Sequence, residues 1–204
     1  MFFNSLLVDE FSLEAIVTPV LASRPAIPKV SNSNIILACN VNGLGWARCE
    51  GKGSFLNSPN LKAWADEQLK SGTVHVVIDL ECCTGMDSTF MGTMAGLAMR
   101  LIKTSKGILE VASADEKNSQ ALDDLGLSSL MQINPQSPSW RGQEGAMRES
   151  LIEYGHVNST DRTKHVFDAH KTLCDADDSN NEKFSTVLDC LEAELLSRDK
   201  SSEK

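Results

Sequence analysis

Apolar residues are densest between residues 74 and 107, which read VHVVIDLECCTGMDSTFMGTMAGLAMRLIKTSKG. The first part, Val74 to Leu80, is a nearly continuous apolar run, which is typical of a strand covered on both faces of a sheet. After a short loop, apolar residues recur at helical spacing from Phe90 to Ile102. Gly107 then provides a helix stop. The pattern predicts a buried parallel strand followed directly by a helix.

The segments on either side alternate between strand and helix patterns. An Asn-Gly dipeptide separates two short β-like runs, 34–41 and 44–50, and favours a tight hairpin turn. Ser58 and Pro59 mark a helix start, with Ser58 as the expected N-cap. Strand and helix patterns alternate again over 108–133. Together they predict an α/β fold, a four- to five-stranded mixed sheet with helices packed on it.

Changes in composition divide the chain into parts. We expect a folded domain over 34–134, preceded by an N-terminal extension over 1–33 that mixes apolar and acidic residues and is disordered or loosely docked. Pro, Ser, Gly and Gln are frequent over 135–159, which predicts a linker. Residues 160–198 have the pattern of a C-terminal helical hairpin, and 199–204 are a tail.

The predicted hairpin has Thr160 as the cap of its first helix, and Asn180 or Asn181 begins the second. Each helix is apolar on one side only, and a two-helix hairpin cannot bury both apolar stripes alone. We therefore expect the hairpin to dock on the domain or to form a homodimer, rather than to act as a dedicated partner-binding arm.

The turn before the central helix carries the candidate chemistry. Asp87 is expected to be the N-cap, with its carboxylate accepting hydrogen bonds from amides of the first turn. Ser88 then lies where a partner protein can reach its hydroxyl and where the helix N-terminus would favour a phosphate. Capping alone is the alternative interpretation, since Ser, Thr and Asp are common at such positions.

The string MDSTFMG at 86–92 resembles the MDSSGLG signature of the STAS domain, the family of sulphate-transporter and anti-sigma-factor-antagonist modules. Upstream, VVIDLECCTGMD resembles the strand and loop before the family's switch serine. Downstream, ILEVASADEKNSQALDDLGLSSLMQI resembles its later strand, helix and last short strand. The motifs occur in the family's order over 34–134, about half of the chain.

The resemblance implies a non-enzymatic partner-switching regulator. An anti-sigma factor antagonist binds, in its unmodified form, a kinase-type anti-sigma factor of the histidine-kinase-like ATPase type and so frees a sigma factor. The kinase then phosphorylates the serine that matches Ser88, and a serine phosphatase is the other expected partner. The resemblance thus makes Ser88 the phosphoacceptor and makes Asp87, Thr89, Met91 and Asn57 the expected partner-binding residues.

Two positions depart from the family pattern. Many antagonists carry an acidic residue in the loop before the first helix, where this chain has Leu56 and Asn57, so the choice of partner is in doubt. The small Gly of the signature is replaced by Phe90, which we expect to be buried because it continues the helix stripe. Gly92 and Gly96 lie one turn apart and predict a close approach of this helix to the sheet.

Composition disfavours several classes of function. The 204-residue chain has a net charge of −9 and no basic segment, which argues against nucleic-acid binding. Six dispersed cysteines do not resemble a secreted disulfide framework and favour a reducing compartment. No apolar run approaches the ~20 residues of a membrane helix, and we expect no signal peptide. The expected location is cytoplasmic, without a membrane partner.

Metal and catalytic sites are weakly indicated. His165, His170 and Cys174 lie close together on one predicted helix, but neither a carboxylate nor a second Cys pair completes a zinc set at the usual spacing. Ser88 lacks the glycine-flanked elbow of a hydrolase, and all four histidines have structural explanations. A Gly-rich phosphate loop is absent from the sequence. We expect no metal, no cofactor and no enzymatic activity.

Two alternative functions stay open. The domain would be a constitutive scaffold or oligomerisation module if Ser88 is never modified. It would be an accessory STAS subunit of a transport system if its neighbours in the genome encode transporter subunits.

Overall fold

The computed structural model describes residues 34–105, 107–155 and 161–202. The expected N-terminal extension, 1–33, and the expected helix cap Thr160 lie outside these ranges. The described residues form a mixed sheet with helices packed against it, which confirms the expected α/β class.

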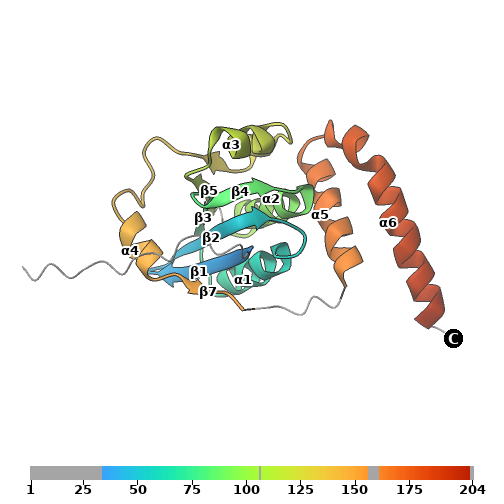
Figure 1. The fold of residues 1–204 in the computed structure, drawn as a ribbon, viewed down its shortest axis with the longest axis horizontal. Helices are drawn as coiled ribbons and strands as arrows, with labels where there is room; N and C mark the ends of the chain where they lie inside the picture. Colours follow the sequence, from blue (N-terminus) through green and yellow to red (C-terminus); the bar gives the residue numbers. More distant parts are fainter. Residues whose placement is uncertain (1–33, 106, 156–160, 203–204) are drawn as a thin grey trace, which may run out of the picture. The chain divides into compact units, whose positions relative to one another are not determined.

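Seven strands make up the sheet (Figure 1). They are β1 (Ile35–Val41), β2 (Leu44–Gly53), β3 (His75–Asp79), β4 (Cys83–Met86), β5 (Ile108–Ala112), β6 (Gln132–Ile133) and β7 (Ile152–Glu153). The strand order is β6-β5-β3-β2-β1-β7, and β4 pairs with β2. Strand β1 is antiparallel to β2 and β7, whereas β2, β3, β5 and β6 run parallel. The strands beyond the expected four to five are β4 and β7, which are too short to show an alternating pattern.

The helices are α1 (Ser58–Lys70), α2 (Ser88–Ser105), α3 (Glu116–Asp123), α4 (Glu144–Glu149), α5 (Arg162–Ala176) and α6 (Asn180–Ser202), with a 3-10 turn η1 (Leu127–Ser129). Apolar residues of α1 and α2 share one core cluster with β3. Helix α5 packs along α2, and α6 packs on α5 (Figure 1).

The turn between β1 and β2 is the tight hairpin that the sequence predicts. Asn42 has a φ of 55° and Gly43 a φ of 83°, and positive values at both positions are what a type I′ turn requires. Val41 pairs directly with Leu44 across the turn.

Strand β3 is covered on both faces, as its continuous apolar run predicts. Val76 and Ile78 pack into the cluster that contains α1 and α2, whereas Val77 packs into a second cluster on the other face. All three residues are at most 1% exposed. The central strand of the candidate site is therefore held rigidly from two sides.

Two buried residues of the second cluster, Trp140 and Met147, come from the segment that we expected to be a linker. The Trp140 ring packs edge-on against Trp46, with centroids 5.2 Å apart, and Met147 is buried beside them. Further along, Ile152 pairs with Ala38 of β1. The linker prediction is wrong over 135–155. It was based on the frequent Pro, Ser and Gly residues and overlooked Trp140 and Met147, whose apolar side chains attach the segment to the sheet.

An ion pair also ties this segment to the sheet. Arg148 Nε lies 3.0 Å from Asp79 Oδ2, and its Nη1 lies 2.9 Å from Glu81 Oε1. Asp79 is completely buried at the end of β3. A buried carboxylate needs such a partner, because its desolvation is otherwise uncompensated.

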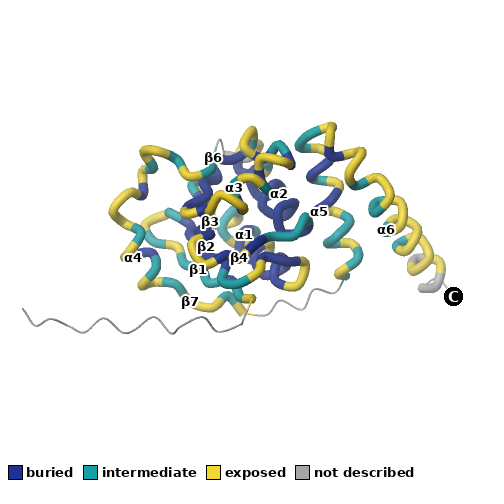
Figure 2. The backbone as a smooth tube through the Cα atoms, turned by 45° about the horizontal axis from the view of Figure 1, so that its top comes forward, coloured by how far each residue is buried: buried dark blue, intermediate teal, exposed yellow. Residues whose placement is uncertain are grey.

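The C-terminal hairpin docks on the domain through its first helix. Leu173 of α5 is buried in the main core, whereas α6 is half-buried or exposed along most of its length (Figure 2). Asp161 caps α5 by accepting a hydrogen bond from the Lys164 amide, in place of the expected Thr160. Helix α6 begins at Asn180, as expected, and continues into the predicted tail.

Replacing Trp140 by alanine should lower the free energy of unfolding by about 3 to 5 kcal/mol, because it removes a buried indole and leaves a cavity. The matched control is Ile152→Ala in the same segment, where the side chain is 71% exposed. This control should change stability by no more than about 0.5 kcal/mol. Urea unfolding measures both values, and equal effects of the two substitutions would mean that the segment is not part of the core.

Candidate functional site

The carboxylate of Asp87 fixes the turn from β4 into α2. Its Oδ1 accepts a hydrogen bond from the Phe90 amide at 2.9 Å, and its Oδ2 accepts one from the Phe55 amide at 2.8 Å. The Asp87 amide donates to the Gly53 carbonyl oxygen at 2.9 Å. The expected N-cap is confirmed, and the same side chain also ties α2 to the loop that precedes α1.

Ser88 occupies the first position of α2 and is half-buried. Its Oγ lies 2.8 Å from Nε2 of His170 in α5. The other ring nitrogen of His170, Nδ1, lies 2.8 Å from the Val166 carbonyl oxygen. A carbonyl only accepts hydrogen bonds, so Nδ1 carries the ring hydrogen and Nε2 accepts from the Ser88 hydroxyl.

A histidine beside Ser88 corrects one expectation. We expected structural explanations for all four histidines and no base next to Ser88, yet α5 brings His170 directly to it. The two residues are 82 positions apart, so no local motif connects them. The pair has two parts of an activated nucleophile: a serine within reach of a base, and a base oriented by a third group.

A second serine and histidine pair lies nearby. Ser58 is fully buried, and its Oγ lies 2.8 Å from Nε2 of His165. Asn57, not Ser58, is the N-cap residue of α1, and it makes no capping hydrogen bond with its side chain. The hydroxyl of Ser58 is therefore used between helices, and two such pairs join α5 to the first turns of α1 and α2.

Gly92 allows the close contact between α2 and α5. A Cβ at Gly92 would lie 2.4 Å from the Ala169 carbonyl oxygen, which is a clash with backbone. A Cβ at Gly96, one turn later, would lie 3.8 Å from Thr172 Cγ2, an ordinary contact. The expected close approach exists, but its partner is α5 and not the sheet, because these glycines lie on the face of α2 turned away from it.

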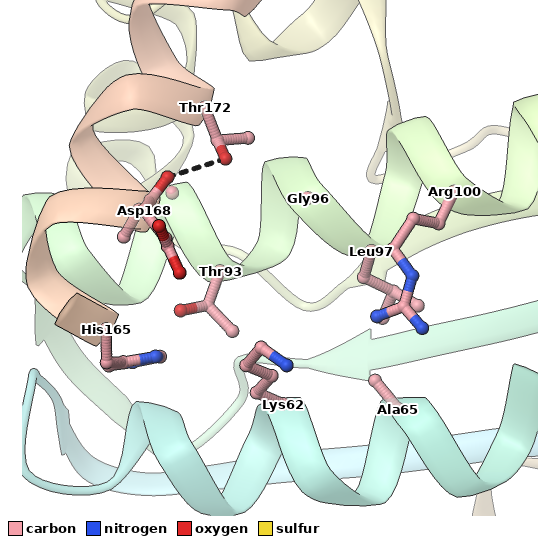
Figure 3. Close-up of a pocket in the computed structure, with 11 residues that line it drawn as sticks. Lys62, Ala65, Thr93, Gly96, Leu97, Arg100, His165, Asp168 and Thr172 are labelled. Carbon is pink, nitrogen blue, oxygen red and sulfur yellow. Dashed lines mark hydrogen bonds between the residues drawn. The ribbon is translucent and has the colours of Figure 1, made fainter. Parts of the chain in front are cut away.

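A pocket of about 160 Å³ lies between α1, α2 and α5 (Figure 3). Lys62 projects into it from α1, Arg100 from α2, and His165 and Asp168 from α5. Lys62 and Arg100 both pair with Asp66. The two cations therefore share one carboxylate, and the pocket is a gap where the three helices meet.

The expected partner-binding residues divide into two groups. Asn57, Thr89 and Met91 are buried, whereas Asp87, like Ser88, is half-buried. The Asn57 side chain accepts a hydrogen bond from the Ser54 amide and donates one to the Lys52 carbonyl oxygen, which shapes the loop before α1. Phe90 is completely buried, as its helix stripe predicts.

An exposed apolar pair beside Asp87 was not among the expected site residues. Phe55 is 43% exposed and Leu56 is 59% exposed, and both belong to the loop that Asp87 holds through the Phe55 amide. The available signal was two adjacent apolar residues in an otherwise polar loop, GKGSFLNSPN. This adjacent pair is a candidate contact point for a partner protein.

Other kinds of site have little support in the described part of the chain. No three His, Cys, Asp or Glu side chains among the described residues are grouped so that they could hold a metal ion. His165 and His170 each contact a different serine. None of the described helices combines the length and apolar character needed to span a bilayer.

No model of a protein family matches the sequence, and no curated protein matches it either. Solved structures of anti-sigma factor antagonists do match. One from Mycobacterium paratuberculosis has a TM-score of 0.47 and 17% identity, covering 58% of this chain and 97% of that one. The unphosphorylated form of SpoIIAA has a TM-score of 0.42 and 14% identity, covering 55% and 94%. The phosphorylated form, described as a Bacillus cell fate determinant, has a TM-score of 0.42 and 17% identity, covering 55% and 96%.

Substituting Asp87 by alanine should cost about 0.5 to 2 kcal/mol of stability, because α2 loses its capping acceptor. Asp87→Asn is the matched comparison, since its single amide oxygen can accept from Phe90 or from Phe55 but not from both. Urea unfolding should therefore place Asp87→Asn between wild type and Asp87→Ala. An alanine variant as stable as wild type would contradict the capping role.

Stability should fall as the pH drops below about 6.5. Burial lowers the pKa of His165, and the Lys62 charge lowers it further, while Asp168 and Asp87 act in the opposite direction. Below pH 6.5 the unfolded chain takes up a proton that folded His165 resists, so unfolding is favoured until the pH falls below the folded pKa.

This dependence is measured as thermal stability between about pH 7.5 and 5.5, in wild type and His165→Gln. The variant should lose less stability over this range. Other titrating groups contribute to both proteins and cancel in the difference. Identical slopes would show that His165 does not resist protonation in the fold.

Proposed function

We propose that the chain is a STAS-type protein-binding switch, similar to an anti-sigma factor antagonist, whose Ser88 hydroxyl accepts a phosphate. The observation that carries the proposal is the presentation of Ser88. Its hydroxyl lies on the first turn of α2, half-exposed, on a corner that the Asp87 carboxylate ties to two elements. This is a geometry in which a modification changes a surface without unfolding it.

The modifying partner in this proposal is a serine kinase of the histidine-kinase-like ATPase type. It transfers the γ-phosphoryl group of ATP to Ser88 Oγ: the new O–P bond forms, the bond to the ADP oxygen breaks, and the hydroxyl proton passes to a base. The phosphate brings about −1.5 to −2 charges to the turn at pH 7. At a helix N-terminus the dipole favours such a charge by about 0.3 to 1 kcal/mol, so α2 itself should stay intact.

The same charge should act strongly in an interface. Breaking charge complementarity in a desolvated contact costs several kcal/mol. About 5.5 kcal/mol is enough to move a two-state equilibrium from 99:1 to 1:99. We therefore propose that the unmodified form binds the kinase-type partner, that the phosphorylated form releases it, and that a serine phosphatase restores the hydroxyl.

The proposed contact surface combines Ser88 and Asp87 with the exposed pair Phe55 and Leu56. The apolar pair would supply the buried centre of an interface, and the charged turn would supply its sensitivity to phosphate. In this proposal Asn57, Thr89 and Met91 support the surface from beneath, because their side chains are buried in the unbound protein.

A serine hydrolase is the second candidate, because His170 Nε2 lies 2.8 Å from the Ser88 hydroxyl. The Phe90 and Phe55 amides, which lie close to Ser88, already donate to Asp87 and are not directed at an oxyanion. A fluorophosphonate probe separates the two candidates. A hydrolase would be labelled covalently at Ser88, whereas we expect no labelling.

Incubation with ATP and a soluble extract of the source cell, followed by mass spectrometry, should place a phosphate on the peptide that contains Ser88. Ser58 is the internal control, because it also begins a helix beside a histidine but is fully buried. We expect no phosphate on Ser58. In the Ser88→Ala variant, the peptide that contains position 88 should carry no phosphate. Phosphorylation elsewhere in wild type with none at Ser88 would contradict the proposal.

The consequence of the charge is tested with Ser88→Asp against purified kinase-type partner. The variant should lose at least tenfold in affinity while its circular dichroism stays native. The control is Ser137→Asp, which adds the same charge at an exposed position on the segment that covers the opposite face of the sheet. Full affinity of Ser88→Asp would argue for a constitutive scaffold.

A further inference from the structure

We infer that the surface of α1 and α2 beside Ser88 is a helix-binding surface, that α5 is its resident occupant, and that docked α5 and a phosphate on Ser88 exclude each other. Helix α5 is therefore an internal mask over the modification site. The regulatory meaning of this mask rests on the proposed function, whereas the physical exclusion does not.

The shape of the contact supports a specific seat for α5. A Cβ at Gly92 would lie 2.4 Å from the backbone oxygen of Ala169 and 3.0 Å from its Cβ, so only glycine fits at this point. Ala169 is itself buried. A helix with a small residue at this position can approach closely, and a helix with a large residue there cannot.

Polar contacts fix the register of α5 on this seat. His165 meets Ser58 on α1 and His170 meets Ser88 on α2, each at 2.8 Å. The same two histidines were candidate metal ligands by their spacing in the sequence, and in the structure each contacts a serine. Their hydrogen bonds hold the N-terminal turns of both α1 and α2 against α5.

The contact between the Ser88 hydroxyl and His170 leaves no space for a phosphate between them. A phosphoryl group on Oγ would bring three oxygens to a position where Oγ and His170 Nε2 are now 2.8 Å apart. The imidazole is held on its other side by the Val166 carbonyl and packs edge-on against Phe184, with centroids 4.9 Å apart. Gly92 also lies against the backbone of α5. Making space for a phosphate on Ser88 therefore requires α5 to move as a unit.

The attachment of the hairpin is suited to such a movement. Its buried apolar side chains are Leu173 and the smaller Ala169 and Cys174, and α6 is mostly half-buried or exposed. Segments with few buried apolar contacts open at lower free energy than the core. Apart from Leu173, the buried residues of the main core lie on the sheet, on α1, α2 and α3, and on the loops between them.

Reciprocity makes this mask testable without knowing the kinase. If docked α5 hinders phosphate on Ser88, then phosphate on Ser88 hinders docking by the same factor. In the cell, opening of α5 would precede modification of Ser88 or entry of a partner helix. A partner that competes would present a helix with a small residue over Gly92.

The first test uses full-length protein with phosphoserine incorporated genetically at position 88, compared with unmodified protein by hydrogen exchange. Amides of α5 should exchange at least tenfold faster in the phosphorylated protein, while those of β3 and β5 stay protected. Phosphoserine at the exposed position Ser137 controls for added charge. Unchanged protection of α5 would mean that His170 accommodates the phosphate, and it would overturn the inference.

The second test removes the seat without adding charge. Gly92→Ala places a Cβ 2.4 Å from the Ala169 oxygen, and Gly96→Ala places one at 3.8 Å from Thr172. Both substitutions favour the helical state of α2 by about 1 kcal/mol, so they are matched in propensity. Only Gly92→Ala should increase hydrogen exchange in α5. With cell extract and ATP, Ser88 should also be phosphorylated severalfold faster in Gly92→Ala than in Gly96→Ala. Equal protection of α5 in both variants would contradict the proposed seat.

The two proposals fail separately. If phosphoserine at position 88 releases α5 but extracts never label Ser88, the mask exists and the phosphorylation switch does not. If extracts label Ser88 while α5 keeps its protection, the switch stands and the mask is wrong.

Discussion

The structure around the candidate site depends on one carboxylate. Asp87 accepts from the amide of Phe90, inside α2, and from the amide of Phe55, in the loop before α1, so a single side chain joins two helix entries. Its own amide donates to Gly53 at the end of β2. Because the strand beneath is packed on both faces, Ser88 is presented on a corner that has little freedom to move. A modification at such a corner would act through the attached group and not through rearrangement of the turn.

The C-terminal hairpin partly covers the turn that carries Ser88. In an isolated domain the first turns of α1 and α2 would face solvent, whereas here α5 places a histidine on a serine in each of them. The contact is tight where Gly92 meets Ala169, and Leu173 is the large apolar side chain that α5 buries in the main core. A partner helix that bound the same surface would have to compete with α5 of the same chain.

Most features with a local sequence signal were predicted correctly, although the caps of α1 and α5 were each one residue off. The type I′ turn, the Asp87 cap and the burial of Phe90 each follow from a few neighbouring residues. Sequence reasoning was inaccurate where distant segments meet: Trp140 folds onto Trp46, and His170 reaches Ser88. Periodicity reports which face of an element is apolar and not what covers that face. Gly92 shows this, since the glycine indicated a close approach but could not name α5 as the neighbour.

Strand β7 has a consequence for the kinetics of the hairpin. It pairs with β1 and so anchors the chain only a few residues before α5 begins at Arg162. If α5 were released from α2, it would therefore stay tethered to the domain. Its effective concentration near the surface of α2 would be on the order of millimolar. A free competitor would need to reach similar levels, or bind far more tightly, to hold the surface. Such an arrangement favours rapid resetting, so the duration of any output would be set by the lifetime of the competing species and not by diffusion of a lost subunit.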